Sequence, residues 1–301
     1  MLDFRMDTFL AVCETMNFTR AAEQLRLTQP AVSQHIHLLE EHYGSKLFTY
    51  QGKRLALTAA GALLRDAART MRHDEAYLAQ QLQALAGTAR PLCLGATLTV
   101  AEYALPEQMA AYLAAHPDEQ IRVTVANTQE LLAGLDRGTL DFALVEGYFT
   151  RGDYDCLLYS QESYVAVCAP NYPLPPAPCR LEDLLGRRLI LRESGSGTRG
   201  ILERYLEARG LGVEDFPRRV EVGNLGAIKA LAARGCGITF LYLRAVQAEL
   251  AQGRLRRIAL QDLEIVHDFN FIWRRGSIFR AQYEAFFREF AQPAADAPAL
   301  H

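Results

Sequence analysis

The sequence predicts an α/β protein in three parts: a head of short helices, one long helix, and a larger half of alternating strands and helices. Three observations support this fold class. Residues 1–60 show short helical periodicities between capping residues, residues 58–86 show one unbroken heptad pattern, and apolar strand-like runs recur from 92 to 273. Alternation of strands and helices is typical of parallel α/β folds, and 301 residues suffice for two or three domains.

Composition excludes several classes of protein. Half of the residues are apolar and 22% are charged, as in globular proteins rather than disordered ones. Asp3, Arg5 and Asp7 interrupt the apolar core that a signal peptide would need. Since no apolar run reaches the roughly 18 residues of a membrane span, we expect a cytoplasmic protein without membrane contact.

The formal net charge of -3 hides an uneven distribution. Residues 1–90 hold ten Lys or Arg and nine Asp or Glu, so the acidic surplus lies in residues 91–301. Between Thr19 and Arg54, five basic residues stand against three glutamates. A general attraction to nucleic acid is therefore absent, but one short segment is locally basic.

The six cysteines form no CxxC motif and no other short-spaced ligand pair. We interpret them as buried or incidental thiols in a reducing compartment; a redox sensor and a metal site are the alternatives. No metal and no cofactor is expected. The cysteines are Cys13, Cys93, Cys156, Cys168, Cys179 and Cys236.

The head is expected to begin with two short helices. Apolar residues at helical spacing predict a first helix over Met6–Met16. Asn17 and Phe18 break it, and Thr19 can cap a second helix over Arg20–Leu25.

A third helix follows after a short connection. Thr28 can cap it, Pro30 falls in the first turn, where its missing N–H costs nothing, and Gly44 ends it after Tyr43. Four apolar residues at positions i, i+4, i+7 and i+11 are expected to face inward. These are Val32, Ile36, Leu39 and Tyr43.

The opposite face of this helix carries Gln29, Ser33, Gln34 and His37. Such side chains donate and accept hydrogen bonds in the way that base edges require. Two short helices, of which the second has a polar outer face, follow the helix-turn-helix plan.

Two strand-like runs next flank a glycine-containing turn with Lys53 and Arg54. A hairpin that brings these side chains to a phosphate backbone is a wing. The alternative is a small helical subdomain with a merely solvated basic hairpin.

A long helix is predicted from Thr58 to about Ala86. At about 1.5 Å per residue it spans about 43 Å, too long for the head to cover. A second copy of the helix would cover its stripe, and packing on the following domain is the alternative. A linker is predicted over Gly87–Pro91. The stripe recurs every seven residues at Leu57, Leu64, Met71, Leu78 and Leu85.

The remaining chain alternates strands with helices. Strands are expected at Leu92–Gly95, Ile121–Ala126, Asp141–Val145, Tyr164–Ala169, Leu189–Leu191, Arg219–Val222, Ile238–Leu241 and Ile265–Trp273. Helices are expected at Tyr103–Ala115, Thr128–Leu135, Leu225–Ala233 and Ile278–Phe290. The Ala- and Pro-rich tail from Gln292 is expected to be disordered.

Three loops could bind a ligand, because in open α/β sheets anions bind beyond strand ends at helix N-termini. They are Gly95–Thr99, Arg192–Gly200 and Gly223–Asn224, and the pairs Asn127–Thr128 and Glu146–Gly147 could complete a pocket. In the second loop, Arg199 supplies a fork for a carboxylate or phosphate. Ordinary helix capping is the alternative for each loop. No GxSxG, HExxH or Rossmann glycine run is present, so we predict no catalytic residues and no enzyme.

The residues of the head resemble those of a known protein family. The run TRAAEQLRLTQPAVS from Thr19 to Ser33, then Leu39-Glu-Glu, Lys46-Leu-Phe and Leu57-Thr-x-x-Gly61, resembles the N-terminal signature of LysR-type transcriptional regulators. The match is ungapped over about sixty residues. Residues from 91 to about 291 also resemble the effector domain of that family, which is similar to periplasmic solute-binding proteins with two lobes crossed twice.

The resemblance implies a domain organisation. It places a winged helix-turn-helix at 1–60, a dimerising linker helix at 61–90, an effector domain at 91–291 and a flexible tail at 292–301. Within the effector domain, lobe one would comprise 91–164 and 268–291, and lobe two 165–267.

The resemblance also implies functional residues. Gln29, Pro30, Ser33 and Gln34, with His37, would lie in the major groove, and Lys53 and Arg54 on the wing. Gln34 and His37 stand where many members have Arg and Lys, which lowers the expected affinity for phosphate. The effector residues would be Thr97, Thr99, Asn127, Glu146, Ser196, Thr198, Arg199 and Asn224.

The expected function is therefore sequence-specific regulation of transcription by a small anionic effector. The implied partners are double-stranded promoter DNA, the effector, a second copy of the chain in a dimer or tetramer, and RNA polymerase. Two rivals remain: a cytoplasmic small-molecule-binding protein or enzyme using only the α/β half, and an architectural protein that binds DNA without sequence preference.

Overall fold

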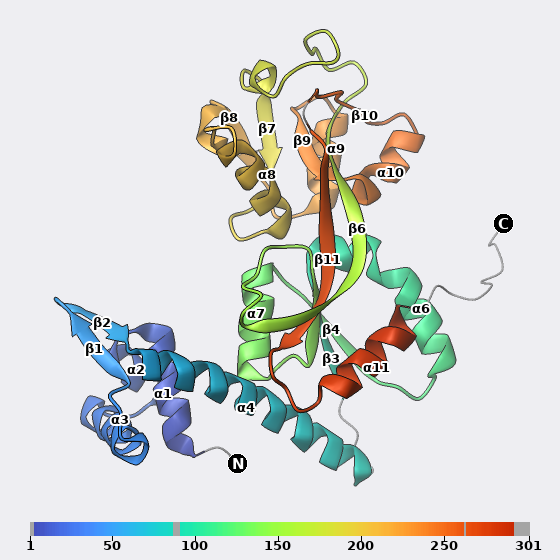
Figure 1. The fold of residues 1–301 in the computed structure, drawn as a ribbon. Helices are drawn as coiled ribbons and strands as arrows, with labels where there is room; N and C mark the ends of the chain where they lie inside the picture. Colours follow the sequence, from blue (N-terminus) through green and yellow to red (C-terminus); the bar gives the residue numbers. More distant parts are fainter. Residues whose placement is uncertain (1–2, 87–90, 262, 292–301) are drawn as a thin grey trace.

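The computed structural model describes residues 3–86, 91–261 and 263–291 as a helical head, a long helix and a two-lobed α/β half (Figure 1). The head lies at one end of the long helix, and the α/β half lies along its other part. The predicted three-part α/β fold is confirmed. Apart from Pro91, the predicted linker lies outside the described residues, as does the predicted disordered tail.

The head consists of three short helices and a two-stranded hairpin, and it has a hydrophobic core of its own. Phe9, Val12, Val32 and Leu47 are buried almost completely in that core. Small heads with a separate core can fold as independent units. The elements are α1 (Phe4–Thr15), α2 (Phe18–Leu25), α3 (Gln29–Tyr43), β1 (Phe48–Gln51) and β2 (Arg54–Leu57).

Helix α3 has the ends that the sequence predicts. The Thr28 hydroxyl accepts a hydrogen bond from the Ala31 N–H at 3.3 Å, and Pro30 stands in the first turn. Gly44 ends the helix in the left-handed conformation at φ 60°, which glycine adopts without steric cost.

Two predictions in the head are wrong. Asn17, rather than Thr19, caps α2, because its side-chain oxygen accepts hydrogen bonds from the N–H groups of Thr19 and Arg20. Tyr43 was expected to face inward but is 45% exposed. The buried stripe of α3 ends at Leu39, and the last turn of the helix lies beyond the core of the head.

The long helix α4 (Ala59–Leu85) was expected to start at Thr58, and Thr58 is its N-cap: the Thr58 hydroxyl accepts a hydrogen bond from the Gly61 N–H at 2.9 Å. The first two stripe residues, Leu57 and Leu64, pack against the core of the head instead of lying on a free face. Beyond them the helix has an exposed apolar stripe. Its exposed members are Met71, Leu78, Leu82 and Leu85, and Leu63 is exposed nearer to the head.

The opposite side of α4 docks on the α/β half of its own chain. Arg69 and Arg72 of α4 both contact Asp136 of the α/β half: Arg69 Nη1 lies 3.3 Å from Asp136 Oδ2, and Arg72 Nη2 donates to the Asp136 carbonyl at 2.8 Å. Charged hydrogen bonds of this kind are stronger than neutral ones. Helix α4 therefore packs within its own chain on one side and leaves the other side free.

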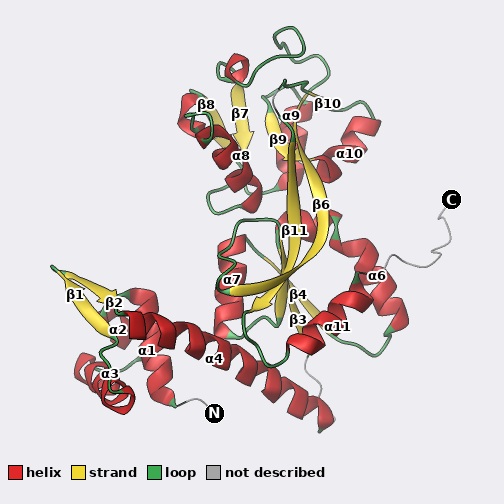
Figure 2. Ribbon diagram, viewed as in Figure 1, coloured by secondary structure: helices red, strands yellow, loops and turns green. Residues whose placement is uncertain are grey.

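The α/β half contains one continuous sheet that passes through both lobes. Its order is β4-β3-β5-β11-β6-β10, with β9 also paired to β6. Strand β3 is parallel to β4 and β5, and β11 is antiparallel to β5 and β6. The long strands β6 and β11 connect the lobes (Figure 2). The strands are β3 (Leu92–Ala96), β4 (Ile121–Val125), β5 (Phe142–Val145), β6 (Tyr154–Cys168), β7 (Arg188–Leu191), β8 (Arg218–Glu221), β9 (Thr239–Tyr242), β10 (Arg256–Arg257) and β11 (Ile265–Arg274).

Helices cover the sheet in both lobes. Lobe one contains β3, β4 and β5 with α5 (Leu98–Tyr103), α6 (Leu105–Ala115), α7 (Thr128–Arg137) and α11 (Arg280–Phe290). Lobe two contains β7, β8 and β9 with α8 (Gly197–Glu207), α9 (Leu225–Ala233), α10 (Leu243–Ala251) and two short 3-10 turns, Glu182–Leu184 and Val213–Asp215.

Two element boundaries differ from the prediction. The helix expected over Tyr103–Ala115 is α6, which begins at Leu105, and it is preceded by a short helix that was not predicted, α5; Pro106 at the start of α6 has no N–H to continue the hydrogen-bond ladder from α5. Strand β6 begins at Tyr154 rather than Tyr164, because it pairs with the whole length of β11.

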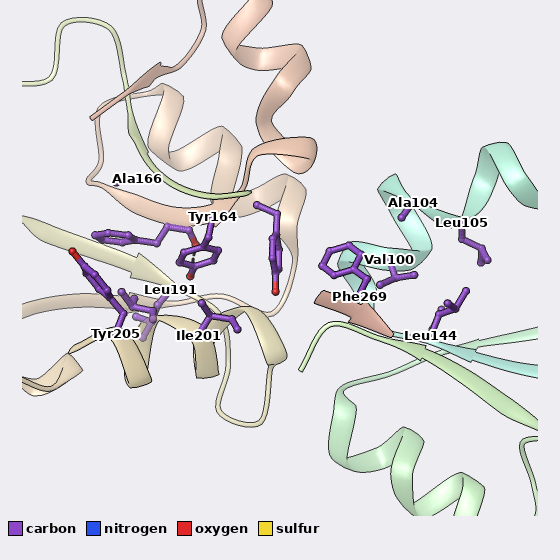
Figure 3. Close-up of a cluster of buried hydrophobic side chains, with 14 of the residues drawn as sticks. Val100, Ala104, Leu105, Leu144, Tyr164, Ala166, Leu191, Ile201, Tyr205 and Phe269 are labelled. Atoms are coloured by element: carbon purple, nitrogen blue, oxygen red, sulfur yellow. Dashed lines mark hydrogen bonds between the residues drawn. The ribbon is translucent and has the colours of Figure 1, made fainter. Parts of the chain in front are cut away.

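Buried apolar side chains extend through both lobes (Figure 3). Val100 and Leu144 come from lobe one, Tyr164 and Ile201 come from lobe two, and Phe269 on β11 lies between them. The crossing strands therefore bring two lobe cores into one buried cluster.

Cys13, Cys156, Cys168, Cys179 and Cys236 are free thiols. Within the described residues, no group of three or more His, Cys, Asp or Glu could hold a metal ion. Of the helices in this part of the chain, none is both long and apolar enough to cross a membrane.

Candidate functional site

The outer face of α3 presents the polar side chains that the sequence predicts to contact DNA. Gln29, Pro30, Gln34 and His37 are exposed, and Ser33 is half-buried between them. Gln29 Nε2 donates to Ser33 Oγ at 2.9 Å. This hydrogen bond orders two side chains at the N-terminal end of the helix, the end that enters the major groove in helix-turn-helix proteins.

The acidic residues toward the other end of α3 have side-chain partners. His37 Nε2 lies 3.1 Å from Glu41 Oε1. Glu40 accepts hydrogen bonds from Lys46 Nζ at 2.5 Å and from the Leu47 N–H at 2.9 Å. Burial opposes ionisation of Glu40, but these donors outweigh it and hold its pKa below the usual value. Glu40 thus ties α3 to the wing and presents little negative charge to a DNA backbone.

The wing holds its two basic side chains at the tip of the hairpin. Gln51 pairs with Arg54 across β1 and β2, and Gly52 turns the chain at φ 64°. Lys53 and Arg54 are exposed, and neither forms an ion pair with any residue that the structure describes. Both cations are therefore available for phosphate contacts.

In the α/β half, the two lobes meet at a pair of glycines. A Cβ on Gly197 of lobe two would lie 2.8 Å from Cα of Gly147 in lobe one. Nearby, Thr99 Oγ1 and Thr198 Oγ1 are 3.2 Å apart across the lobes. Only residues without side chains allow the two backbones to approach so closely, and this approach brings the lobe-facing hydroxyls together.

Glu146 is buried at the centre of this interlobe site. Its Oε1 accepts a hydrogen bond from the Thr198 hydroxyl at 2.8 Å, and its backbone carbonyl accepts one from the Tyr242 hydroxyl at 3.4 Å. Burial raises the pKa of Glu146 to about 6. Hydrogen bonds from Thr99 and Thr198 and the charge of Arg192 act in the opposite direction but do not cancel the cost of burial.

Five buried polar atoms from both lobes lie at or beside this junction without a hydrogen-bond partner among the described residues. Buried polar atoms in proteins are normally hydrogen-bonded, so such a group favours a polar ligand or ordered water. Helices α5, α7 and α8 also begin here, and N-termini favour anions. The five atoms are Thr97 Oγ1, Thr128 Oγ1, Ser196 Oγ, Glu146 Oε2 and Arg192 Nη1.

Three predicted effector residues have other partners. Arg199 binds two carboxylates, with Nε 2.7 Å from Glu203 and Nη1 2.7 Å from Glu221. Asn127 and Asn224 cap α7 and α9 with their side-chain oxygens. The structure thus brings together Thr97, Thr99, Glu146, Ser196 and Thr198 at the lobe junction. It does not bring Arg199 into this group.

Two residues at the junction were predicted only as members of candidate loop segments and not as individual effector residues. Thr128 is the first residue of α7, and Arg192 directly follows β7, so both occupy the positions where strand ends meet helix starts. That position was the available signal. Arg199 was predicted instead; Glu203 at position i+4 of the same helix was a local signal of an ion pair, whereas the second partner, Glu221 on β8, lies farther along the chain.

Comparisons with known proteins agree with this geometry. Residues 5–62 match the family described as bacterial regulatory helix-turn-helix protein, lysR family, and residues 85–294 match the LysR substrate binding domain. The RuBisCO operon transcriptional regulator of Acidithiobacillus ferrooxidans is 30% identical over 97% of this chain and 94% of its own length.

Solved structures share the fold. Full-length LysG from Corynebacterium glutamicum with bound effector Arg is 18% identical, with a TM-score of 0.60 over 97% of this chain and 98% of that chain. The CcmR regulatory domain of Synechocystis in complex with 2-PG is 20% identical, with a TM-score of 0.60 over 69% of this chain and 99% of that chain. The chain belongs to the LysR family: it is a DNA-binding transcriptional regulator with an effector-binding domain, not an enzyme.

Proposed function

We propose that a dimer of this chain reads two half-sites of promoter DNA and that a small anion bound between the lobes controls this binding. In each head, Gln29, Ser33 and Gln34 contact base edges in the major groove, while Lys53 and Arg54 contact the phosphate backbone. The exposed polar face of α3 and the unpaired cations of the wing support these roles.

The observation that carries the effector proposal is the group of unpartnered polar atoms at the lobe junction. Three hydroxyls and the Arg192 guanidinium can donate hydrogen bonds, and α7 and α8 direct their N-termini to the same place. The fold alone does not decide the charge of a ligand, because one structural relative holds Arg and another holds 2-PG. The hydrogen-bond donors of this chain favour a compact anion, whereas the carboxylate of Glu146 disfavours one.

The exposed stripe of α4 supports a dimer through this helix, with Leu78, Leu82 and Leu85 covered by a second copy. A homotetramer would need another surface. The edge strand β4, where Val123 and Val125 are exposed, is the candidate. RNA polymerase is a further proposed partner, because a regulator on a promoter binds beside it. The free thiols fit a reducing cytoplasm.

Selection from a pool of random DNA duplexes tests the DNA proposal. The wild-type protein should enrich an inverted repeat, and Gln34→Ala should bind that repeat with a reduced preference over mismatched duplexes, by about 1–3 kcal/mol per lost base contact. Gln247→Ala, at an exposed position on α10, is the control and should change nothing. Unchanged discrimination by Gln34→Ala would remove that side chain from the recognition face.

A thermal-shift screen of small anions tests the effector proposal. An anion present at 100 times its dissociation constant should stabilise the wild-type protein by about 2.7 kcal/mol. Thr128→Val keeps the shape of the side chain but removes the hydroxyl, so it should reduce this shift. Thr150→Val, at an exposed position, should not. Equal shifts in all three proteins would show that the anion binds elsewhere.

A further inference from the structure

The interlobe site contains a negative side chain where the proposed ligand is also negative. Glu146 directly follows β5 in lobe one and is 1% exposed. Its Oε1 is satisfied by Thr198, but its Oε2 has no hydrogen-bond donor among the described residues. A buried acceptor without a donor is costly, so Oε2 favours any ligand that brings a donor to it.

The charged and titratable groups that face Glu146 do not neutralise it. Arg192, which directly follows β7 in lobe two, acts on Glu146 with its positive charge, but its Nε and Nη2 donate to the carboxylate of Glu193 at 2.8 and 2.7 Å. Tyr164 on β6 and Tyr242 on β9 have pKa values raised by burial and further by Glu146, so both hydroxyls stay protonated.

The remaining titratable neighbour is His267 on the crossing strand β11. Its ring interacts with the backbone of Glu146, and burial lowers its pKa below the usual value. A neutral imidazole adds no positive charge to the site at neutral pH. An oxyanion that enters the interlobe site therefore meets a carboxylate whose charge only Arg192 partly offsets.

A proton between two oxyanions changes repulsion into a short charge-assisted hydrogen bond. We propose that Glu146 makes the interlobe site selective for an oxyanion that binds together with one proton, either on the ligand or on Glu146 Oε2, and that it turns away fully deprotonated oxyanions. This inference rests on the anion site proposed above and names the chemical class that the site accepts.

The same arrangement makes the affinity for a proton-free oxyanion depend on pH. Because burial brings the pKa of Glu146 to about 6, the side chain can take up a proton in mildly acidic solution. An anion that carries no proton should therefore bind more tightly as pH falls, whereas an anion with its own O–H depends less on the protonation of Glu146.

Inorganic phosphate and inorganic sulfate test the proposal, because both are tetrahedral oxyanions and only phosphate keeps an O–H at neutral pH. With the full-length protein at pH 7.5, phosphate should bind at least tenfold more tightly than sulfate in calorimetry. Glu146→Gln should bring the two affinities within about threefold, because its amide can donate to sulfate. Glu207→Gln, at an exposed position on α8, should keep the wild-type preference.

A measurement on the wild-type protein covers the case in which Glu146→Gln folds poorly. Sulfate should bind at least tenfold more tightly at pH 5.5 than at pH 7.5, while phosphate changes less. Equal affinities for the two anions at pH 7.5, or a sulfate affinity that ignores pH, would overturn the role of Glu146 and leave the anion site standing. No binding of either anion to wild type and Glu146→Gln would overturn the anion site itself.

Discussion

Gly61, in the first turn of α4, shows how closely that helix approaches the head. A Cβ at this position would lie 2.0 Å from the carbonyl oxygen of Leu47, which is backbone and cannot move aside like a side chain. Gly61→Ala gains about 1 kcal/mol of helix propensity but should lose about 2–3 kcal/mol to overpacking. We expect a net fall of about 1–2 kcal/mol in the free energy of unfolding, measured in urea.

Gly200→Ala is the matched control for that substitution. It lies inside α8, and a Cβ there meets only the ring of Tyr148 at 4.0 Å. We expect this variant to be more stable by about 0.5–1 kcal/mol. If the two glycine variants changed stability in the same direction, the contact with Leu47 would not constrain α4.

Glu146 should also control how stability depends on pH, without any ligand. Its pKa rises from 4.5 to about 6 on folding, so the native state binds the proton more tightly than the unfolded state. The wild-type free energy of unfolding should therefore fall as pH rises from about 4.5 to about 6. Glu146→Gln should be more stable than wild type by about 2 kcal/mol at pH 8, and the difference should vanish at pH 4. Thermal melts across this pH range measure the difference in stability between wild type and Glu146→Gln, with Glu207→Gln as the control. A difference that stayed constant with pH would contradict the burial argument.

Single residues also show which interactions the sequence alone can predict and which it cannot. The cap Thr28 was predicted because a cap and its target N–H lie only three residues apart in the sequence. Arg199 on helix α8 was predicted to bind a ligand, but Glu221 on strand β8 neutralises part of its charge. A partner that is distant in the chain leaves no local signal.

At the scale of elements, the exposed stripe of α4 makes the dimer testable. Leu78 and Leu82 are 44% and 57% exposed, although they lie on a helix whose other side is docked. Replacing both with Glu places like charges in the proposed dimer contact, so we expect monomers in analytical ultracentrifugation and a loss of affinity for the inverted repeat. Leu158→Glu, at an exposed leucine on β6, should remain dimeric. A dimer that survived the double substitution would place the interface elsewhere.

The elements themselves were predicted unevenly. Helix α3 and the wing were placed closely, because a capping residue, a glycine and a short periodicity mark each end. Strand β6 was placed only in part: its first half is exposed enough to lack an apolar run, and its length comes from pairing with β11. These two strands are about a hundred residues apart, and the sequence of neither one indicates that it pairs with the other.

At the scale of the whole molecule, the net charge of -3 limits general attraction to DNA, so the few free cations of the head should dominate the salt dependence of binding. Lys53→Ala should lower the slope of log affinity against log salt by about two for a dimer, or about one per lost phosphate contact. Lys46→Ala should change the slope less, because Lys46 is already paired with Glu40. An unchanged slope in Lys53→Ala would place the wing away from the phosphates.

The sequence by itself determined the head, the long helix and the alternating α/β half, because caps, heptads and strand-helix alternation act over a few residues. It also marked the strand ends at which we propose that a ligand binds. Only the tertiary structure decided the interlobe site. Thr99, Glu146 and Thr198 come from three distant segments, and their contact buries a carboxylate with one oxygen unpartnered. Burial and the choice of partner depend on all the chain that surrounds a residue, and no local pattern carries that information.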